Sequence, residues 1–323
     1  MVFRPMPSDL AKLTPLLLAV LSCKAGVIRV ADLPVYHFGP AAIVKELALP
    51  SKVENPTLTA DSLQIFFTTN RNSGTNADVW FARRSSVTEP FGTPEVVAGV
   101  NSDDRETSAA ISPDGLTLWL GSERPGGLGE VDIWVAERPS TSGDWSTPVN
   151  LAPLNSSADD IPRPPGQHGL VMPMASTNAH ADHYWTYLAA RADSASPFQM
   201  PVAIQELQYS DRSTVDAFLT DDGLTMFFSS SPRTSGGEAE DGGTSDGGAG
   251  GAGGAGGATS TAADLHVAFR RSINEPFSLT QALEDLNTSF DERDPFLSAD
   301  ESTLYFTSDR DGTLAIYTAP VIR

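Results

Sequence analysis

Apolar and polar residues alternate along short stretches of this chain, and turns rich in Gly, Pro and Asp separate the stretches. Within residues 111–138, a Pro-Asp-Gly turn precedes one alternating run, and a Gly-rich loop precedes a second. A period of two between turn residues predicts short antiparallel strands. Helical periodicity is nearly absent, which disfavours a parallel α/β fold. The pattern therefore predicts an all-β protein.

The same turn recurs along the chain at a nearly constant spacing. Its positions are 61, 114, 166, 222 and 300, so the steps are 53, 52, 56 and 78. An aromatic residue ahead of an outer strand repeats with similar steps, at Phe38, Phe91, Trp145, Phe198 and Phe277. A strand that ends in Ala and a basic residue is a third marker. About four short strands in units of roughly 50 residues are typical of a β-propeller, and the chain predicts five four-stranded antiparallel blades.

The repeats are circularly permuted. The last copy stops after its third strand at Arg323, whereas residues 36–47 hold an outer strand with no inner strands before it. We expect residues 36–47 to complete the last blade, so that main-chain hydrogen bonds close the ring. The propeller is expected over residues 35–323. A Gly-rich insertion at 234–261 predicts a disordered loop between the second and third strands of the fourth blade.

The N-terminal residues predict a targeting segment. Arg4 and Lys12 precede a short apolar run that ends at Cys23, the only cysteine of the chain. This pattern is similar to a bacterial lipoprotein signal peptide over residues 1–23, with Cys23 as the lipidated residue and residues 24–34 as a tether. A cleaved secretory signal and a cytosolic tail are the alternatives. The apolar run is too short to span a bilayer, so we expect membrane attachment only through the lipid.

Composition narrows the choice of partner. The 323 residues include 21 Lys and Arg against 41 Asp and Glu, which gives a formal charge of −20. Nucleic acids and anionic membrane surfaces require a basic footprint that this chain does not offer. A single cysteine permits neither an internal disulfide nor a thiolate zinc cluster. We therefore expect a monomer whose partner is an envelope protein or a glycan.

Three segments of the repeat resemble the TolB-type, WD-repeat-like β-propeller family of bacterial envelopes. They are Ser112–Trp119, Ser122–Gly127 and Asp132–Val135, and the lead-in Asp291–Pro295 is similar as well. The resemblance covers nearly the whole chain after residue 35 and implies a propeller that serves as an interaction platform. TolB itself has six blades and an additional N-terminal α/β domain. This chain predicts five blades and no such domain, so the partner of TolB is not carried over.

The blade connections are acidic, and the loops between second and third strands carry arginines at equivalent positions. Both sets of loops share one face of a propeller, so we expect a charged ring around the axial mouth. The expected ring comprises Arg71, Asp104, Glu106, Arg124, Asp159, Asp160, Asp216, Asp291, Glu292 and Arg310. Such a ring either binds a peptide or glycan through charge-assisted hydrogen bonds, or it pins adjacent blades.

The sequence assigns no metal ligand and no cofactor. Calcium held by clustered Asp side chains stays an option, although no spacing matches a calcium loop. His180, Asp182 and His183 contain the only close histidine pair, and these residue types bind zinc. Side chains on a hairpin need not converge, so a polar loop is the simpler interpretation.

The chain has no Gly-x-Ser-x-Gly nucleophile elbow, and its only thiol is the expected lipidation site. Some five-bladed propellers are glycosidases that use carboxylates at the axial mouth, and Asp216 is the least repeat-like acid here. We assign no catalytic residue. The sequence predicts a non-catalytic, lipid-anchored envelope protein that binds a protein or glycan, with a secreted glycosidase as the alternative.

Overall fold

The computed structural model describes residues 35–70, 76–232 and 262–322. The expected signal peptide, Cys23, the tether, Arg71 and the Gly-rich stretch 234–261 lie outside the described residues. One compact unit spans Tyr36–Arg323 and consists almost entirely of strands. In the part of the chain that the structure describes, no helix is long and apolar enough to cross a membrane.

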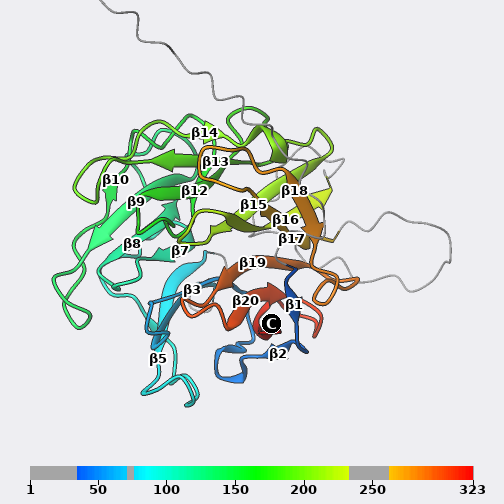
Figure 1. The fold of residues 1–323 in the computed structure, drawn as a ribbon. Helices are drawn as coiled ribbons and strands as arrows, with labels where there is room; N and C mark the ends of the chain where they lie inside the picture. Colours follow the sequence, from blue (N-terminus) through cyan, green and yellow to red (C-terminus); the bar gives the residue numbers. More distant parts are fainter. Residues whose placement is uncertain (1–34, 71–75, 233–261, 323) are drawn as a thin grey trace, which may run out of the picture. The chain divides into compact units, whose positions relative to one another are not determined.

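Five antiparallel sheets follow one another along the chain and form a five-bladed β-propeller, as predicted (Figure 1). Blade I consists of β3 (Val53–Leu58), β4 (Gln64–Thr69), β5 (Asp78–Arg83) and β6 (Glu95–Val96). Blade II consists of β7 (Glu106–Ile111), β8 (Thr117–Ser122), β9 (Asp132–Glu137) and β10 (Val149–Asn150). Blade III consists of β11 (Asp160–Pro162), β12 (Val171–Ser176), β13 (Trp185–Ala190) and β14 (Val202–Ala203).

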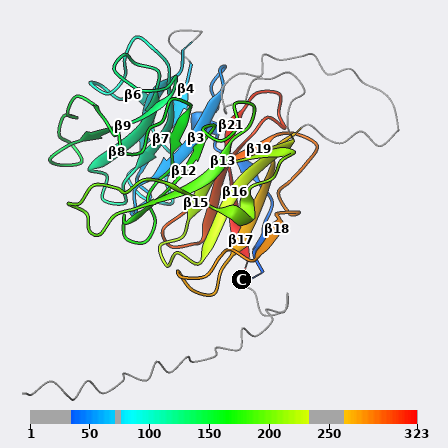
Figure 2. The ribbon, with the colours of Figure 1, turned by 90° about the horizontal axis from the view of Figure 1, so that it is seen from above.

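Blade IV consists of β15 (Arg212–Leu219), β16 (Thr225–Pro232), β17 (Asp264–Phe269) and β18 (Leu279–Ala282), which lie side by side in both views (Figure 1, Figure 2). Blade V consists of β19 (Glu292–Leu297), β20 (Thr303–Ser308) and β21 (Ala315–Ile322), with β1 (His37–Phe38) and β2 (Ala42–Ile43). Two single-turn 3₁₀ helices, η2 (Lys45–Leu47) and η3 (Gln205–Leu207), lie in blade connections.

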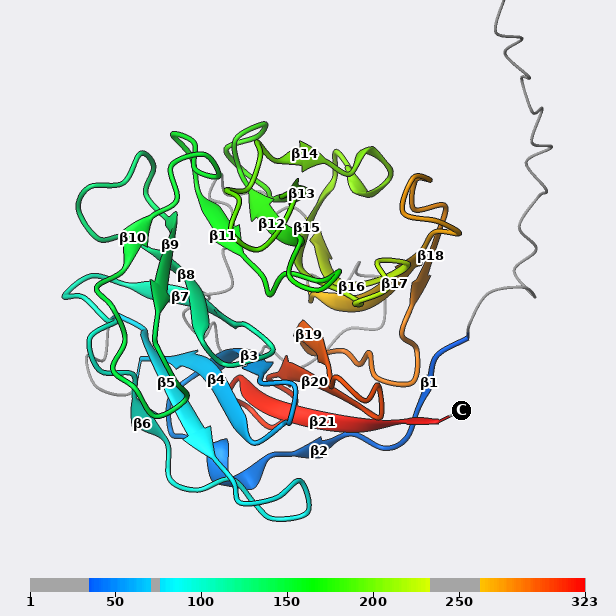
Figure 3. The ribbon, with the colours of Figure 1, turned by 60° about the vertical axis from the view of Figure 1, so that its left-hand side comes forward.

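The N-terminal strands close the ring. Both β1 and β2 pair antiparallel with β21, with Phe38 opposite Val321 and Ile43 opposite Tyr317. Figure 3 shows the two blue strands beside the red C-terminal strand. The predicted closure by residues 36–47 is confirmed, and its physical reason is that β21 needs a hydrogen-bonded neighbour on its outer edge.

The core lies between adjacent blades, where each sheet buries its faces against the next. Trp134 packs with Phe66 between blades I and II, and Trp119 packs with Met172 between blades II and III. Each blade connection contributes at least one buried aliphatic side chain. These residues include Leu47, Val100, Leu154, Leu207 and Leu286. Full burial of one such side chain contributes about 1.5–3 kcal/mol to folding, so every joint stabilises the ring.

Candidate functional site

The two ends of the ring carry different loops. The blade connections and the loops between second and third strands lie at one end, which we call the joint face. The turns between first and second strands lie at the other end, which we call the hairpin face. Except for Asp216, the described residues of the expected charged ring belong to the joint face.

Glu106 and Arg124 form an ion pair inside blade II. Arg124 Nη2 donates to Glu106 Oε1 at 2.9 Å, and the hydroxyls of Ser102 and Ser122 donate to the same oxygen at 2.5 and 3.0 Å. Burial raises the pKa of Glu106, and the bonds from Ser102 are the largest opposing cause. Arg124 also donates to the carbonyl of Val100 at 2.7 Å. The pair thus joins β7 to the end of β8 and to the connection that enters blade II from blade I.

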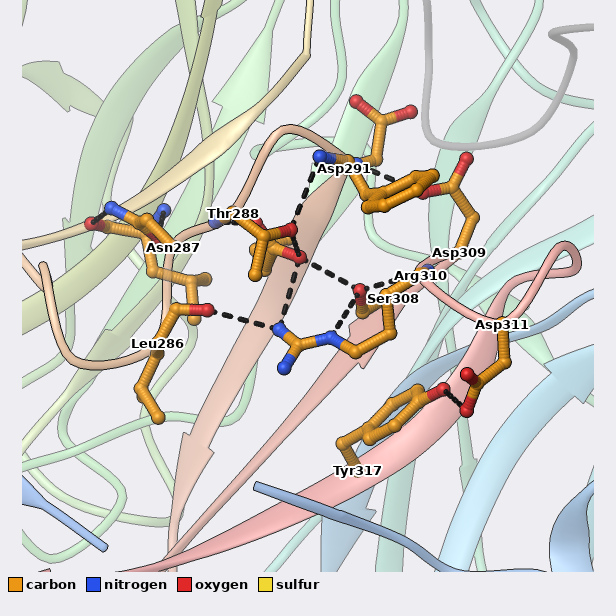
Figure 4. A network of polar contacts seen from close by, with 12 residues as sticks. Leu286, Asn287, Thr288, Asp291, Ser308, Asp309, Arg310, Asp311 and Tyr317 are labelled. Atoms are coloured by element: carbon orange, nitrogen blue, oxygen red, sulfur yellow. Dashed lines mark hydrogen bonds and ion pairs between the residues drawn. The ribbon is translucent and has the colours of Figure 1, made fainter. Parts of the chain in front are cut away.

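Blade V repeats this arrangement with Glu292 and Arg310. Figure 4 shows Arg310 near Leu286 and Ser308. Arg310 Nη2 donates to Glu292 Oε1 at 3.0 Å and to the carbonyl of Leu286 at 2.9 Å. The Ser308 hydroxyl donates to the same carboxylate oxygen at 2.8 Å. Because two blades share the arrangement atom for atom, we interpret it as part of the framework.

Blade III replaces the arginine. Asp160 occupies the place of Glu106 and accepts the main-chain N–H and the hydroxyl of Ser156 at 2.6 and 2.8 Å. Burial raises the pKa of Asp160 to about 6. Asn178 stands where blade II has Arg124, since each main-chain N–H bonds to the serine hydroxyl two residues earlier. The third blade therefore holds its acid without a guanidinium at this position.

Two other acids of the joint face join adjacent blades. Asp159 accepts hydrogen bonds from the main-chain N–H of Val131 at 3.1 Å and from the Tyr184 hydroxyl at 3.0 Å. Asp291 accepts the main-chain N–H of Ala263 at 2.7 Å. Val131 belongs to blade II and Ala263 to blade IV, so both contacts cross a joint. This geometry matches the pinning alternative for these two residues.

Asp216 lies inside the ring rather than on a face. It has a positive φ of 59°, as do Asn55, Ser108 and Asp294 at 58°, 49° and 56°. The inner strands β3, β7, β15 and β19 all shift register at this point, and such bulges re-aim a side chain. Asn and Asp tolerate this backbone region better than most residues. Asp216 therefore has counterparts in three other blades.

Side chains from these bulges meet near the axis. Asp294 accepts the main-chain N–H of Asn55 at 3.0 Å, and Arg163 of blade III donates to the Asn55 side chain at 3.0 Å. Burial, followed by the charge of Asp294, raises the pKa of Asp216 to about 7 and that of Glu54 to about 8. The Ser229 hydroxyl donates to Asp216 at 2.5 Å. The axis thus holds a buried network in which two carboxyls resist ionisation.

A cavity of about 840 Å³ opens on the hairpin face. The hairpins of all five blades line it, through Thr59–Ala60, Ser112–Asp114, Pro164–Gly166, Thr220–Asp221 and Ser298–Ala299. It extends outward between blades II and III to the side chains of Trp119, Val135, Leu151, Leu154 and Phe198. A cavity of this volume lies within the range of small-molecule and peptide-anchor sites.

The cavity extends to this joint because the first strand of blade III is short. Strand β11 has three residues, whereas β3, β7 and β19 have six and β15 has eight. Pro162, Pro164 and Pro165 have no N–H group for pairing with β12. One isolated bridge, between Gly166 and Val171, follows them. The inner wall recedes there and uncovers the outer strands of blades II and III.

Charges at the cavity are mostly negative. The lining includes the carboxylates of Asp114, Glu137, Asp221 and Glu301 and the guanidinium of Arg191. Arg191 donates to the carbonyls of Gly169 and Ser194 at 2.8 and 3.0 Å. Two of its donors are thus used to hold loops of blade III itself. The surface offered to a ligand is apolar, with an acidic surround.

A second set of arginines forms a structural group that the sequence did not predict. Arg84, Arg138, Arg191 and Arg270 each donate from Nε to a hairpin carbonyl of their own blade at 2.6–2.8 Å. Each guanidinium also lies 4.4–4.7 Å from an aromatic ring, a cation–π distance. The rings are those of Phe91, Trp145, Phe198 and Phe277. The sequence displays both markers, but their contact depends on the blade geometry.

No protein-family model matches the chain, and no curated protein sequence matches it. Among solved structures, α-L-arabinofuranosidase from Lactobacillus brevis is similar with a TM-score of 0.52 and 11% identity, over 87% of this chain and 94% of that chain. At this identity the likeness shows the fold alone.

Two TolB structures are also among the structural neighbours. TolB from Acinetobacter baumannii has a TM-score of 0.46 and 13% identity, over 85% of this chain and 56% of that chain. A putative TolB from Agrobacterium tumefaciens has a TM-score of 0.48 and 13% identity, over 83% and 76%. The chain therefore spans just over half the length of the Acinetobacter protein. Membership of a TolB-type repeat family stays a prediction from the sequence.

Proposed function

We propose that this protein is a non-catalytic binding module of the bacterial cell envelope and that its hairpin-face cavity holds a segment of a partner protein. The observation that carries the proposal is the cavity of about 840 Å³ on the hairpin face, which extends outward between blades II and III. This extension lies where the chain departs from its own repeat, so the fold does not require it. Apolar clefts with a few polar groups are the usual sites for ligands.

The lining favours a segment that combines apolar and basic residues. Trp119 and Phe198 form part of the wall between blades II and III, and the lining holds four carboxylates against one internally bonded guanidinium. The formal charge of −20 adds a long-range attraction for cations. A partner segment with Lys or Arg beside apolar anchors matches both features.

The envelope location rests on the N-terminal pattern. A basic start, a short apolar run and Cys23 together support lipid anchoring after cleavage. Feeding labelled palmitate to cells that make the wild type or Cys23→Ala tests this directly. We expect label in the wild type alone, and an unlabelled wild type would remove the anchor from the proposal.

Glycoside hydrolysis is the second candidate function. Glu54 and Asp216 have pKa values raised to about 8 and about 7, a range suited to general acids. Against this function, neither residue lines the cavity, and Asp216 is bonded to Ser229 in the interior. Assays on a panel of chromogenic glycosides should give no turnover. Turnover that Asp216→Asn abolishes would establish the enzyme instead.

Selection from a phage-displayed random peptide library tests the binding function. We expect enrichment of peptides that carry Lys or Arg beside aromatic or aliphatic residues, with binding that weakens as salt rises because exposed charges are screened. Ala195 is exposed and lines the cavity, so Ala195→Trp should fill it and weaken the selected peptides about tenfold or more. Ala192 is exposed in the same loop and does not line the cavity, so Ala192→Trp is the matched control.

The binding of the selected peptides to the three proteins distinguishes a site in the cavity from a site elsewhere. Peptides that bind the wild type and Ala192→Trp but not Ala195→Trp support the cavity as the site. Peptides that bind all three proteins equally place the site elsewhere. Failure of selection together with saturable binding to a glycan array would replace the protein partner by a carbohydrate.

A further inference from the structure

A group of potential metal ligands gathers in the loop that joins β12 and β13 of blade III. The loop reads His180-Ala181-Asp182-His183. One ligand atom from each of His180, Asp182 and His183 lies within 4.8 Å of the others. The two imidazole rings stack with centroids 4.4 Å apart and planes 20° apart. These side chains therefore converge, which a hairpin loop does not require.

The side chain of His183 is oriented so that its Nε2 atom can bind a metal ion. Its side chain is 1% exposed, and its Nδ1 lies 2.8 Å from Asp182 Oδ1. A carboxylate accepts hydrogen bonds, so Nδ1 carries the proton and Nε2 presents the lone pair. Nε2 is buried and has no hydrogen-bond partner within the described ranges. A carboxylate that orients a histidine, which leaves the opposite nitrogen for an ion, is the common outer-shell arrangement of metal sites.

His180 can complete the coordination by a small movement. Its side chain is exposed, so it can turn without disturbing the core. Bond lengths of about 2.0–2.1 Å to nitrogen place neighbouring ligands roughly 3.4 Å apart in a tetrahedral site. The ring centroids of His180 and His183 are 4.4 Å apart, so a local rotation of the exposed His180 side chain is the movement that would bring one of its nitrogens to this separation. Tilting the exposed ring out of its stacked position directs its lone pair toward the His183 nitrogen.

We propose that this loop is a binding site for a divalent transition-metal ion such as Zn²⁺. His183 Nε2 and a ring nitrogen of His180 are the protein ligands, Asp182 orients His183, and water fills the remaining positions. Imidazole nitrogen suits zinc, copper and nickel, whereas calcium and magnesium require oxygen donors. The loop lies on the joint face, at the opposite end of blade III from the hairpin-face cavity, so the proposal does not depend on the peptide site.

Cobalt is a suitable probe because it substitutes for zinc and absorbs visible light when coordinated. The full-length protein, treated with chelator and dialysed, is titrated with Co²⁺ and then with competing Zn²⁺. We expect saturation at one ion per chain and displacement by Zn²⁺. His180→Ala should weaken Co²⁺ binding about tenfold or more, and Asp182→Asn by about 10–100-fold.

His168→Ala is the matched control. His168 is an exposed histidine of the same blade, and it pairs with Asp221 on the hairpin face. This variant should bind Co²⁺ as the wild type does. Because His183 is buried, His183→Ala risks misfolding; the exposed His180 keeps the test valid. Circular dichroism before titration verifies that every variant is folded.

Trp185 provides an independent readout. Its ring lies 4.4 Å from that of His180 in an edge contact and 5.9 Å from that of His183. Cu²⁺ at the site should quench its fluorescence, and Trp185→Phe should lose the quenching while it still binds Co²⁺. Absence of saturable Co²⁺ binding in the wild type would overturn the proposal. Equal Co²⁺ binding by the wild type and His180→Ala would overturn it as well.

Discussion

Blades II and III show how one repeat serves two purposes. In blade II the inner strand has six residues, a Ser-Pro-Asp-Gly turn follows it, and a buried ion pair of Glu106 and Arg124 fastens it. In blade III the inner strand stops after three residues at a proline-rich stretch, and Asn178 replaces the arginine. Blade II is complete as framework. Blade III lacks the longer inner strand and the ion pair, and both the histidine loop and the outward extension of the cavity occur beside it.

The difference indicates where to look for function in a repeat protein. Residues that recur in several blades have a structural explanation in the bonds that they make, as Arg124 and Arg310 do. Features that a single blade carries have no such explanation. Pro164–Gly166 and His180–His183 are of this second kind. We therefore propose that the irregular blade contributes to binding and that the regular blades contribute to stability.

The largest expected effect concerns ring closure by the regular framework. Deletion of residues 1–47 removes β1, β2 and the buried side chains of Phe38 and Leu47. The deletion loses the folding free energy of these two buried side chains and of the pairing with β21. Together these contributions are comparable with the whole net stability of a folded domain, about 5–15 kcal/mol. We expect no cooperative thermal transition by circular dichroism. Deletion of residues 1–34 is the control and should shift the Tm by less than about 2 °C. Equal melting of the two truncated proteins would contradict the closure.

A smaller effect should separate blades II and III directly. Arg124→Ala leaves the buried Glu106 without its cation and should lower the free energy of unfolding by about 3–5 kcal/mol. Asn178→Ala at the equivalent place in blade III should cost less than about 1 kcal/mol. Urea denaturation of both variants measures the difference. Similar losses would mean that blade III is fastened as firmly as blade II and would weaken the comparison.

The axial network predicts an unusual pH dependence. The pKa of Glu54 is raised to about 8, so between pH 4.5 and 8 the folded state keeps a proton that the unfolded chain releases. Stability is therefore highest below the unfolded pKa and falls as pH rises through this window, by an amount on the order of a few kcal/mol. Glu54→Gln should flatten much of the slope, and Asp216 and Asp160, whose pKa values are also raised, contribute to the remainder.

Urea denaturation at several pH values measures this slope. Glu46→Gln, at an exposed position, is the control and should keep the slope of the wild type. A stability that rises with pH over the same range in the wild type would show that Glu54 is ionised in the folded protein.

The fold could be predicted because three markers share one period. The turn, the aromatic residue and the basic residue each report the same unit, and only blades of about four strands fit its length. Closure followed from the missing fourth strand of the last copy. The contacts of Arg84, Arg138, Arg191 and Arg270 could not be predicted, because residues that are distant in sequence meet only once the blades are built.

The candidate site was harder to predict for a physical reason. Loop charge drew attention to the joint face, yet Glu106, Arg124, Glu292 and Arg310 are bonded to one another in the framework. Pro164–Gly166 reads as a degenerate copy of the turn, and the sequence does not reveal that its missing N–H groups open a cavity. Asp216 appears unusual in the sequence, whereas its bulge has counterparts in three other blades. Burial and strand register, which the sequence does not state, decide these cases.

The central claim is that the irregular blade III creates the binding site on the hairpin face. Hydrogen exchange measured by mass spectrometry, with and without a peptide selected by the wild type, tests it most directly. Slower exchange is expected in segments 112–117, 164–170 and 194–198, which contain cavity-lining residues. No change is expected in residues 100–106 or 286–292 of the joint face. Protection confined to those joint-face segments would contradict the account.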